Sequence, residues 1–149
     1  MRFASGNVYD GEWDEGVRCG MGESTYANGD RFTGSFKHDK KHGEGSYFYK
    51  NGNTYVGGWH MDSRHGKGTY TFANGEWYTG DYDMNTRHGY GSYRNANGER
   101  YEGEYSRNKK HGKGKYTYNS GATYDGDWLD DKKSGNGVYT FPDGEKYEG

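Results

Sequence analysis

The sequence predicts an all-β protein, an elongated single-sheet antiparallel β-meander built from 23-residue β-hairpin repeats. Three observations support this prediction. An aromatic residue opens a Y-x-G pattern every 23 residues, a G-x-G pair follows inside each unit, and an Asn-Gly, Ser-Gly or Asp-Gly turn closes it. The aromatic and glycine positions alternate with a period of two, which is typical of strands. Short connections between successive strands make neighbours antiparallel.

The repeat accounts for nearly all the glycines. Its four glycine columns hold 26 of the 28 glycines, and only Gly16 and Gly58 lie outside them. We therefore assign residues 1–149 to one array. It has a partial repeat at 1–8, six repeats starting at residues 9, 32, 55, 78, 101 and 124, and a partial repeat at 147–149. The unfinished repeats at both ends favour a piece of a longer array.

The third repeat illustrates the expected geometry. We predict a strand at Thr54–Trp59, a loop to His65 and a second strand at Gly66–Thr71. Glycine then faces glycine and tyrosine faces tyrosine across the hairpin, and Trp59 faces Gly66. Glycine allows the backbone of a sheet to bend, and rings that lie over the bare glycines give the sheet a packed face. We expect a curled sheet with an aromatic and glycine concave face.

Composition fits a core made of rings. Hydrophobic residues make up only 28% of the chain, whereas aromatic residues make up 18% and include 17 tyrosines. The formal net charge of −2 gives no overall attraction to nucleic acid, so we expect no nucleic-acid partner. A single cysteine, Cys19, and the lack of a long apolar run or signal pattern predict a cytoplasmic protein.

Two segments of the third repeat carry a family resemblance. Residues 55–59 read YVGGW and residues 65–70 read HGKGTY. This pattern resembles the MORN (membrane occupation and recognition nexus) repeat. The resemblance implies a scaffold of the kind found in ciliary radial spokes, protist cytoskeletal rings and membrane junctions, or an appendage to an enzyme. Residues 109–112, KKHG, look most like repeats of radial-spoke-head proteins.

No group of residues predicts catalysis, a cofactor or a metal. The histidine column, which consists of His42, His65, His88 and His111, is spaced by two strands, or roughly 10 Å, whereas zinc ligands converge on one ion. Cys19 and Ser134 occupy the same column, so we interpret it as structural and Cys19 as no nucleophile. The chain is expected not to be an enzyme.

The column before the histidines is uniformly basic. Its members are Arg18, Lys41, Arg64, Arg87, Lys110 and Lys133. One interpretation is a solvated loop in which each basic residue pairs with the Asp or Asn two places earlier. The other is a cationic rail for an anionic partner, either a phosphoinositide head group or the acidic surface of a scaffold protein.

Aromatic residues on the expected outer face are a second candidate site. The predicted register places Phe48, Thr54, Thr71, Trp77 and Arg94 in one outer row, and Val56 and Tyr90 lie nearby. An exposed Trp77 would suit a protein partner, since tryptophan and tyrosine are enriched at binding hot spots. The alternative is a local cation–π pair between Trp77 and Arg94.

The sequence therefore favours a non-catalytic structural scaffold and protein–protein interaction module. We expect it in a ciliary (radial-spoke-like) or other cytoskeletal assembly, with a cytoskeletal, axonemal location. The alternatives are a phosphoinositide-binding module at a membrane junction and an accessory array of a larger enzyme. Weak binding to anionic lipid and self-association through the open sheet ends are further expectations.

Overall fold

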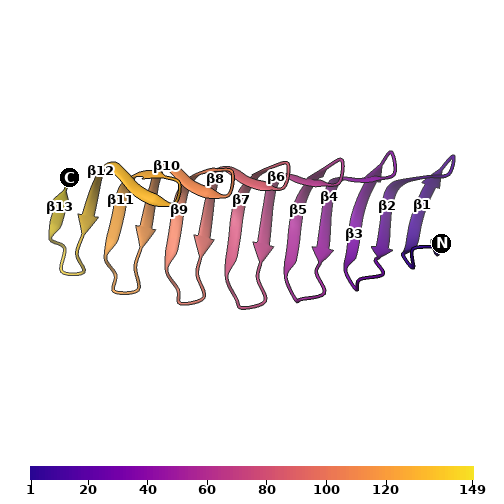
Figure 1. Cartoon of the computed structure of the whole chain (residues 1–149), viewed down its shortest axis with the longest axis horizontal. Coiled ribbons are helices and arrows are strands. Elements are labelled where there is room, and N and C mark those ends of the chain that lie inside the picture. The colour runs from indigo at the N-terminus through magenta and orange to yellow at the C-terminus, as the bar shows by residue number, and fades with distance from the viewer.

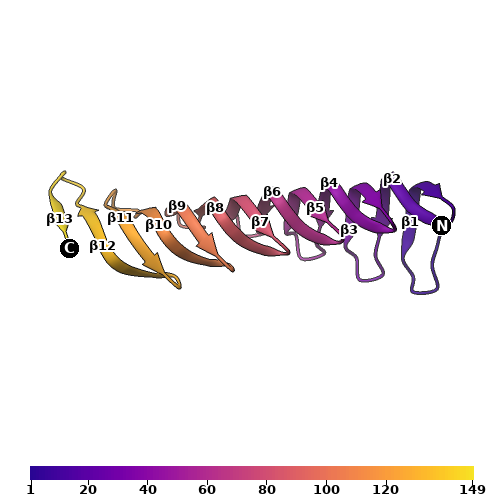
Figure 2. The same cartoon turned by 90° about the horizontal axis from the view of Figure 1, so that it is seen from above.

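A computed structural model describes all residues, 1–149. It contains one open antiparallel sheet of 13 strands in chain order, and every described element is a strand. The strands are β1 (Val8–Asp14), β2 (Val17–Thr25), β3 (Arg31–Lys37), β4 (Lys40–Phe48), β5 (Thr54–His60), β6 (Ser63–Thr71), β7 (Trp77–Asp83), β8 (Thr86–Arg94), β9 (Arg100–Ser106), β10 (Lys109–Thr117), β11 (Thr123–Leu129), β12 (Lys132–Thr140) and β13 (Lys146–Glu148). They stack side by side into a rod, and the hairpins bend so that the sheet curls (Figures 1 and 2). The predicted all-β hairpin meander is confirmed.

The turn inside each hairpin is shorter than we predicted. In the third repeat β5 continues to His60 and β6 resumes at Ser63, so the turn holds only Met61 and Asp62. Both residues have positive φ, 47° and 74°. Positive φ at both central positions is the signature of a type I′ turn, whose twist matches that of paired strands. The predicted loop up to His65 is therefore wrong.

A bulge changes the expected pairing near this turn. Gly57 pairs with Gly68 as expected, but Trp59 pairs with Arg64 and not with Gly66. Residues 65–67 of β6 stand opposite Gly58 alone, so β6 carries two extra residues against β5. Gly66 accommodates them with a φ of 80°. A bulge bends and twists its strand, and repetition of this bulge in the other hairpins accounts for the curl.

Aromatic rings form the core on the inner face. The first ring of the third repeat, Tyr55, is fully buried and lies edge-on to Trp59 and to Tyr82 of the next repeat, with both centroids 5.2 Å away. Edge-to-face pairs of this kind are favourable beyond the area they bury. Equivalent contacts join the other repeats, so one ring cluster runs along the rod. The predicted aromatic and glycine face is confirmed.

Each hairpin is also joined to the next at its tip. The Lys41 amide donates to Asp62 Oδ1, and the Asp62 amide donates to the Lys41 carbonyl, both over 2.9 Å. At the opposite edge the Lys50 amide donates to Asp30 Oδ1 over 2.8 Å. These hydrogen bonds span one repeat, so the rod is held together by contacts between neighbours.

The ends of the chain differ in pairing. In the N-terminal partial repeat, Arg2 forms an isolated bridge with Val8, and the first strand begins at Val8. At the other end β13 pairs with β12 through Tyr147 and Tyr139. The structure contains no helix long and apolar enough to cross a membrane.

Candidate interaction surfaces

The basic column lies over the rings of the inner face. The Arg64 guanidinium carbon is 5.4 Å from the ring centroid of Tyr70 and 5.3 Å from that of Tyr82. The Arg87 carbon is 5.4 Å from the Tyr93 centroid. We call this surface the concave groove. It is lined by the six basic residues named above and by the half-buried tyrosines Tyr47, Tyr70, Tyr93, Tyr116 and Tyr139.

The partners of these cations come from the following hairpin. Arg18 pairs with Asp39 at 2.6 Å, and Lys41 Nζ lies 3.4 Å from Asp62. The prediction that the partner lies two places earlier in the same loop is therefore wrong. The residue at the hairpin tip has a left-handed backbone, and its carboxylate accepts the backbone amide of the preceding hairpin. The Arg18 hydrogen bond lowers the pKa of Asp39.

Two consecutive repeats lack that carboxylate. Arg64 and Arg87 face Asn85 and Asn108, and each guanidinium donates from Nη2 to the asparagine backbone carbonyl, over 3.0 Å and 2.9 Å. The asparagine side chains still accept the arginine amides over 2.8 Å. Asparagine therefore preserves the structural hydrogen bond but neutralises no charge. The concave groove has its uncompensated arginines in the middle of the rod.

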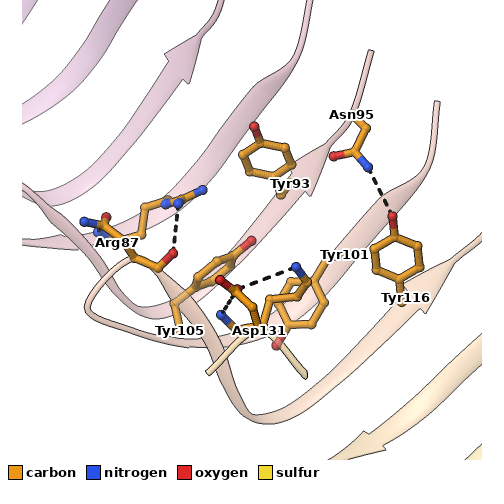
Figure 3. A pocket seen from close by; sticks show the side chains of 9 residues that line it. Arg87, Tyr93, Asn95, Tyr101, Tyr105, Tyr116 and Asp131 are labelled. Atoms are coloured by element: carbon orange, nitrogen blue, oxygen red, sulfur yellow. Dashed lines mark hydrogen bonds and ion pairs between the residues drawn. The ribbon is translucent and has the colours of Figure 1, made fainter. Parts of the chain in front are cut away.

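Two hollows open beside Arg87. One of about 340 Å³ lies between Arg87 and Lys110 and is bordered by Tyr93 and Tyr116 (Figure 3). The other, of about 220 Å³, lies between Arg64 and Arg87. The groove is therefore indented on both sides of Arg87.

Burial and local contacts set the ionisation of two tyrosines that line these hollows, Tyr82 and Tyr116. Burial raises the pKa of Tyr82 to about 12, although the nearby arginines oppose the shift. Burial also raises the pKa of Tyr116 to about 12, with a further contribution from its 2.8 Å hydrogen bond to Glu99. Asn95 donates to the Tyr116 hydroxyl over 3.1 Å (Figure 3). Both hydroxyls are therefore neutral near pH 7, and hydrogen bonds fix that of Tyr116 in position.

The histidine column supports the turns. His42 Nδ1 accepts the Met61 amide over 3.3 Å, and His88 Nδ1 accepts the Arg107 amide over the same distance. His60 adds a ring 4.9 Å from that of His42. Desolvation, followed by the charges of His60 and Lys37, lowers the pKa of His42. No group of three or more His, Cys, Asp or Glu side chains is placed to hold a metal ion.

The outer row has the predicted register. Phe48 pairs with Thr54, Thr71 with Trp77, and Trp77 with Arg94. Val56 and Tyr90 are exposed, at 53% and 56%. Trp77, which we expected to be exposed, is half-buried.

The alternative considered for Trp77, a cation–π contact with Arg94, is not formed. The cation–π contact of this row instead places Arg31 4.7 Å from the ring of Phe48. Arg31 and Phe48 are directly opposite each other on β3 and β4, so the guanidinium reaches the ring across the pair.

Sequence reasoning missed an acidic column at the bulge. Asp81 accepts the Tyr90 amide, and Asp127 accepts the Asn136 amide, both over 3.0 Å. These carboxylates satisfy amides that the bulge leaves without a strand partner. The signal was present, because an acidic residue directly precedes the second ring in four repeats, at Glu12, Asp81, Glu104 and Asp127. Gly58 replaces it in the third repeat, where a Cβ would overlap the His65 carbonyl.

These repeats match a known family model. The MORN repeat model matches six consecutive segments, residues 9–31, 32–54, 55–77, 78–100, 101–123 and 124–146. The chain belongs to the MORN repeat family. A search of curated proteins found no significant match to this MORN array.

Solved structures resemble the MORN array in fold. One is the TCP domain of Drosophila melanogaster SAS-4 in complex with a proline rich motif of Ana2. It has a TM-score of 0.61 and 14% identity, and the match covers 99% of this chain and 80% of that one. Another is the TCP10c domain of Drosophila melanogaster Sas-4, with a TM-score of 0.54, 13% identity, and coverage of 99% and 88%.

Proposed function

We propose that this MORN array is a non-catalytic scaffold module that binds an extended segment of a protein partner along the concave groove. The observation that carries the proposal is the continuity of the groove. Each repeat adds one cation placed over ring faces, and the tyrosine column adds a half-buried ring in five of the units. Rigid aromatic rings and arginines are the residue types that dominate protein interfaces. A repeat array presents them in a line that suits an extended ligand.

The solved SAS-4 structure lends indirect support. That domain shares the fold and was captured with a proline rich motif of another protein. We carry over to this chain only the idea that a curled sheet of this shape binds a peptide segment. The groove residues of this chain, and not the neighbour's, define what the segment must contain.

The proposed setting is a cytoskeletal assembly, and within it a ciliary, radial-spoke-like one at the axoneme. The support is the KKHG pattern of residues 109–112. Proximity labelling in ciliated cells with the tagged chain tests the setting. Recovery of cytoskeletal proteins without axonemal ones would remove the ciliary part of the proposal and leave the scaffold function.

A matched pair of tyrosines on β8 tests which face binds. Tyr93 lines the concave groove, whereas Tyr90, three residues earlier, is exposed on the outer face. We would replace each in turn by a photoreactive phenylalanine analogue and irradiate the protein with its cell extract. A crosslink from position 93 and none from position 90 is the expected result. The reverse result would transfer the binding site to the outer candidates Trp77, Phe48, Val56, Arg94 and Tyr90.

Recognition of an anionic head group, such as a phosphoinositide, is the second candidate function. Arg64 and Arg87, which lack a carboxylate partner, favour it. Against it, Arg18, Lys41 and Lys110 are paired with carboxylates, so three of the six cations offer little net charge. Flotation with anionic vesicles tests it: binding that survives neutralisation of Lys41, Arg64, Arg87 and Lys110 would exclude these residues as the lipid site.

Two further roles stay predictions. One is self-association by pairing of sheet edges between copies, which a concentration series in analytical ultracentrifugation would detect. The other is a role as an accessory array of a larger enzyme, which the sequence of the full open reading frame would test.

A further inference from the structure

We propose that Arg64 and Arg87 form a two-point anion site that selects an acidic polyproline II segment with carboxylates three residues apart. The inference rests on the proposed function, because it specifies the partner segment of the same concave groove. It starts from a departure from the repeat. The tip residue is Asp at positions 39, 62 and 131 but Asn at 85 and 108.

The two arginines retain unused hydrogen-bond donors. A guanidinium has five N–H donors. Arg87 uses one of them, from Nη2 to the Asn108 carbonyl. Arg64 makes the equivalent bond to Asn85 and adds a long contact of 3.4 Å from Nε to Asn85 Oδ1. Contacts with ring faces leave the N–H groups at the edge of the guanidinium available to a carboxylate, which they bind in a fork geometry.

Three of the other four groove cations have carboxylate partners, and the fourth, Lys133, lies two repeats beyond Arg87 without one. Arg18 and Lys41 on one side, and Lys110 on the other, each have a carboxylate from the next hairpin. Arg64 and Arg87 thus form a local positive segment between neutralised flanks. Both are half-buried among rings, so solvent screens their charge less than it screens a fully exposed side chain. An acidic partner complements this segment.

Spacing selects the backbone conformation of the partner. Arg64 and Arg87 occupy equivalent positions two strands apart, which is about 9.6 Å along the rod. A polyproline II helix rises about 3.1 Å per residue with three residues per turn, so residues i and i+3 lie on one side about 9.3 Å apart. In a β-strand, residues i and i+3 point to opposite faces. For carboxylates three residues apart, the polyproline II form therefore presents both to the two arginines, whereas a β-strand presents one.

The tyrosine column supplies the apolar part of the site. Tyr70 borders the hollow between the two arginines, and Tyr93 borders the next one. Proline-rich segments bind aromatic-lined grooves because their conformation is already formed and little entropy is lost. The expected segment therefore reads as Glu-Pro-Pro-Glu and its variants. Prolines contact the tyrosines, and the carboxylates contact the arginines.

Fluorescence anisotropy with labelled peptides tests the proposal on the full chain. The probes are proline-rich peptides with two Glu at i and i+3, with two Glu at i and i+4, and with Gln at i and i+3. The double variant Asn85→Asp/Asn108→Asp supplies both arginines with internal carboxylates. It is expected to fold, since Asp occupies the same position in three other repeats. Thr71→Asp/Thr79→Asp adds the same charge on the outer face, opposite residues that are not acidic.

We expect the peptide with Glu at i and i+3 to bind. Its affinity should be at least about tenfold higher than that of the Gln peptide and of the i, i+4 Glu peptide, and should fall by the same factor in the Asn85→Asp/Asn108→Asp variant. Binding to Thr71→Asp/Thr79→Asp should be retained. Equal binding of the Glu and Gln peptides, or equal loss in both double variants, would overturn the proposal. The proposal would also be overturned if none of the peptides bound while anionic vesicles bound the protein and lost that binding in the Asn85→Asp/Asn108→Asp variant.

The outcome separates this inference from the proposed function. A partner that crosslinks to position 93 but competes with none of the peptides would refute the acidic polyproline segment and leave groove binding in place. A crosslink from position 90 alone would refute the groove as the binding face, whatever the peptides do.

Discussion

The ring of Tyr55 lies against the bare backbone of Gly68, close enough that a Cβ at position 68 would overlap the ring. The Tyr55 hydroxyl reaches past the glycine row and donates to the Gly58 carbonyl over 2.8 Å. Because the same relation recurs at Tyr78 with Gly91 and at Tyr101 with Gly114, it is the packing unit of the array.

Gly68→Ala should destabilise the protein by about 2–3 kcal/mol, because the added methyl overpacks a buried ring. Gly66→Asn on the same strand is the control. Gly66 has a positive φ of 80° but no atom within 4 Å of an added Cβ, and asparagine tolerates that backbone. Its cost should stay below about 1 kcal/mol. Chemical denaturation measures both, and equal losses would contradict the packing argument.

Tyr55→Phe should cost about 1–2 kcal/mol, because it leaves the buried Gly58 carbonyl without its hydrogen bond. The chain contains its own comparison, since Phe32 occupies the equivalent position in the second repeat. Phe32→Tyr should be neutral or stabilising in thermal denaturation. A marked loss of stability in Phe32→Tyr would show that the hydroxyl is not a general part of the repeat.

Asn85→Ala should cost about 2–3 kcal/mol. Part of the loss is the strain of alanine at a φ of 74°, and part is the lost acceptor for the Arg64 amide at 2.8 Å. Asn85→Gly avoids the strain and removes only the side-chain hydrogen bonds, of which that to the Arg64 amide is the shortest, so it should cost about 1 kcal/mol. Hydrogen exchange at the Arg64 amide should accelerate in both variants. Unchanged protection there would mean that the tip does not join neighbouring hairpins.

Stability should fall in alkaline solution. Burial raises the pKa of Tyr82 and of Tyr116 to about 12 in the folded protein, against 10.0 for a free tyrosine. A folded-state pKa above the unfolded one gives a contribution that is complete below pH 10 and is lost as the pH rises towards 12. Thermal midpoints measured from pH 8 upward should decline from about pH 10. Tyr82→Phe should decline less steeply, and an identical slope would exclude Tyr82 as a cause.

Most of the fold was predictable because the repeat encodes it redundantly. Rings and glycines at fixed positions identify the strands, the face and the outer row that contains Phe48 and Trp77. The bulge was not predictable from one repeat. Pairing Trp59 with Gly66 or with Arg64 puts the same face inward, so the alternating pattern of rings and glycines does not distinguish the two pairings.

The sequence predicted which residues form the candidate site, but not where their side chains lie. The basic column is evident in the sequence, yet its position over the rings depends on that bulge, which moves Arg64 opposite Trp59. The pairing of Lys41 with Asp62 joins residues 21 positions apart, whereas Asp39 is two positions away in the sequence. The tip of each hairpin contacts the hairpin before it, so the partner of a basic residue does not follow from proximity in sequence.

The serial arrangement of the hairpins has a mechanical consequence. The hydrogen bonds between strands run along the rod, so the ladders lie in series between its two ends (Figure 1). Tension applied to the ends loads each ladder by peeling and not by shear, and hairpins detach one at a time. A repeat occupies about 10 Å when folded and spans about 76–83 Å when its 23 residues are pulled straight. The same array that acts as a short spacer at rest therefore becomes an extensible tether under load, which lengthens in steps of one repeat.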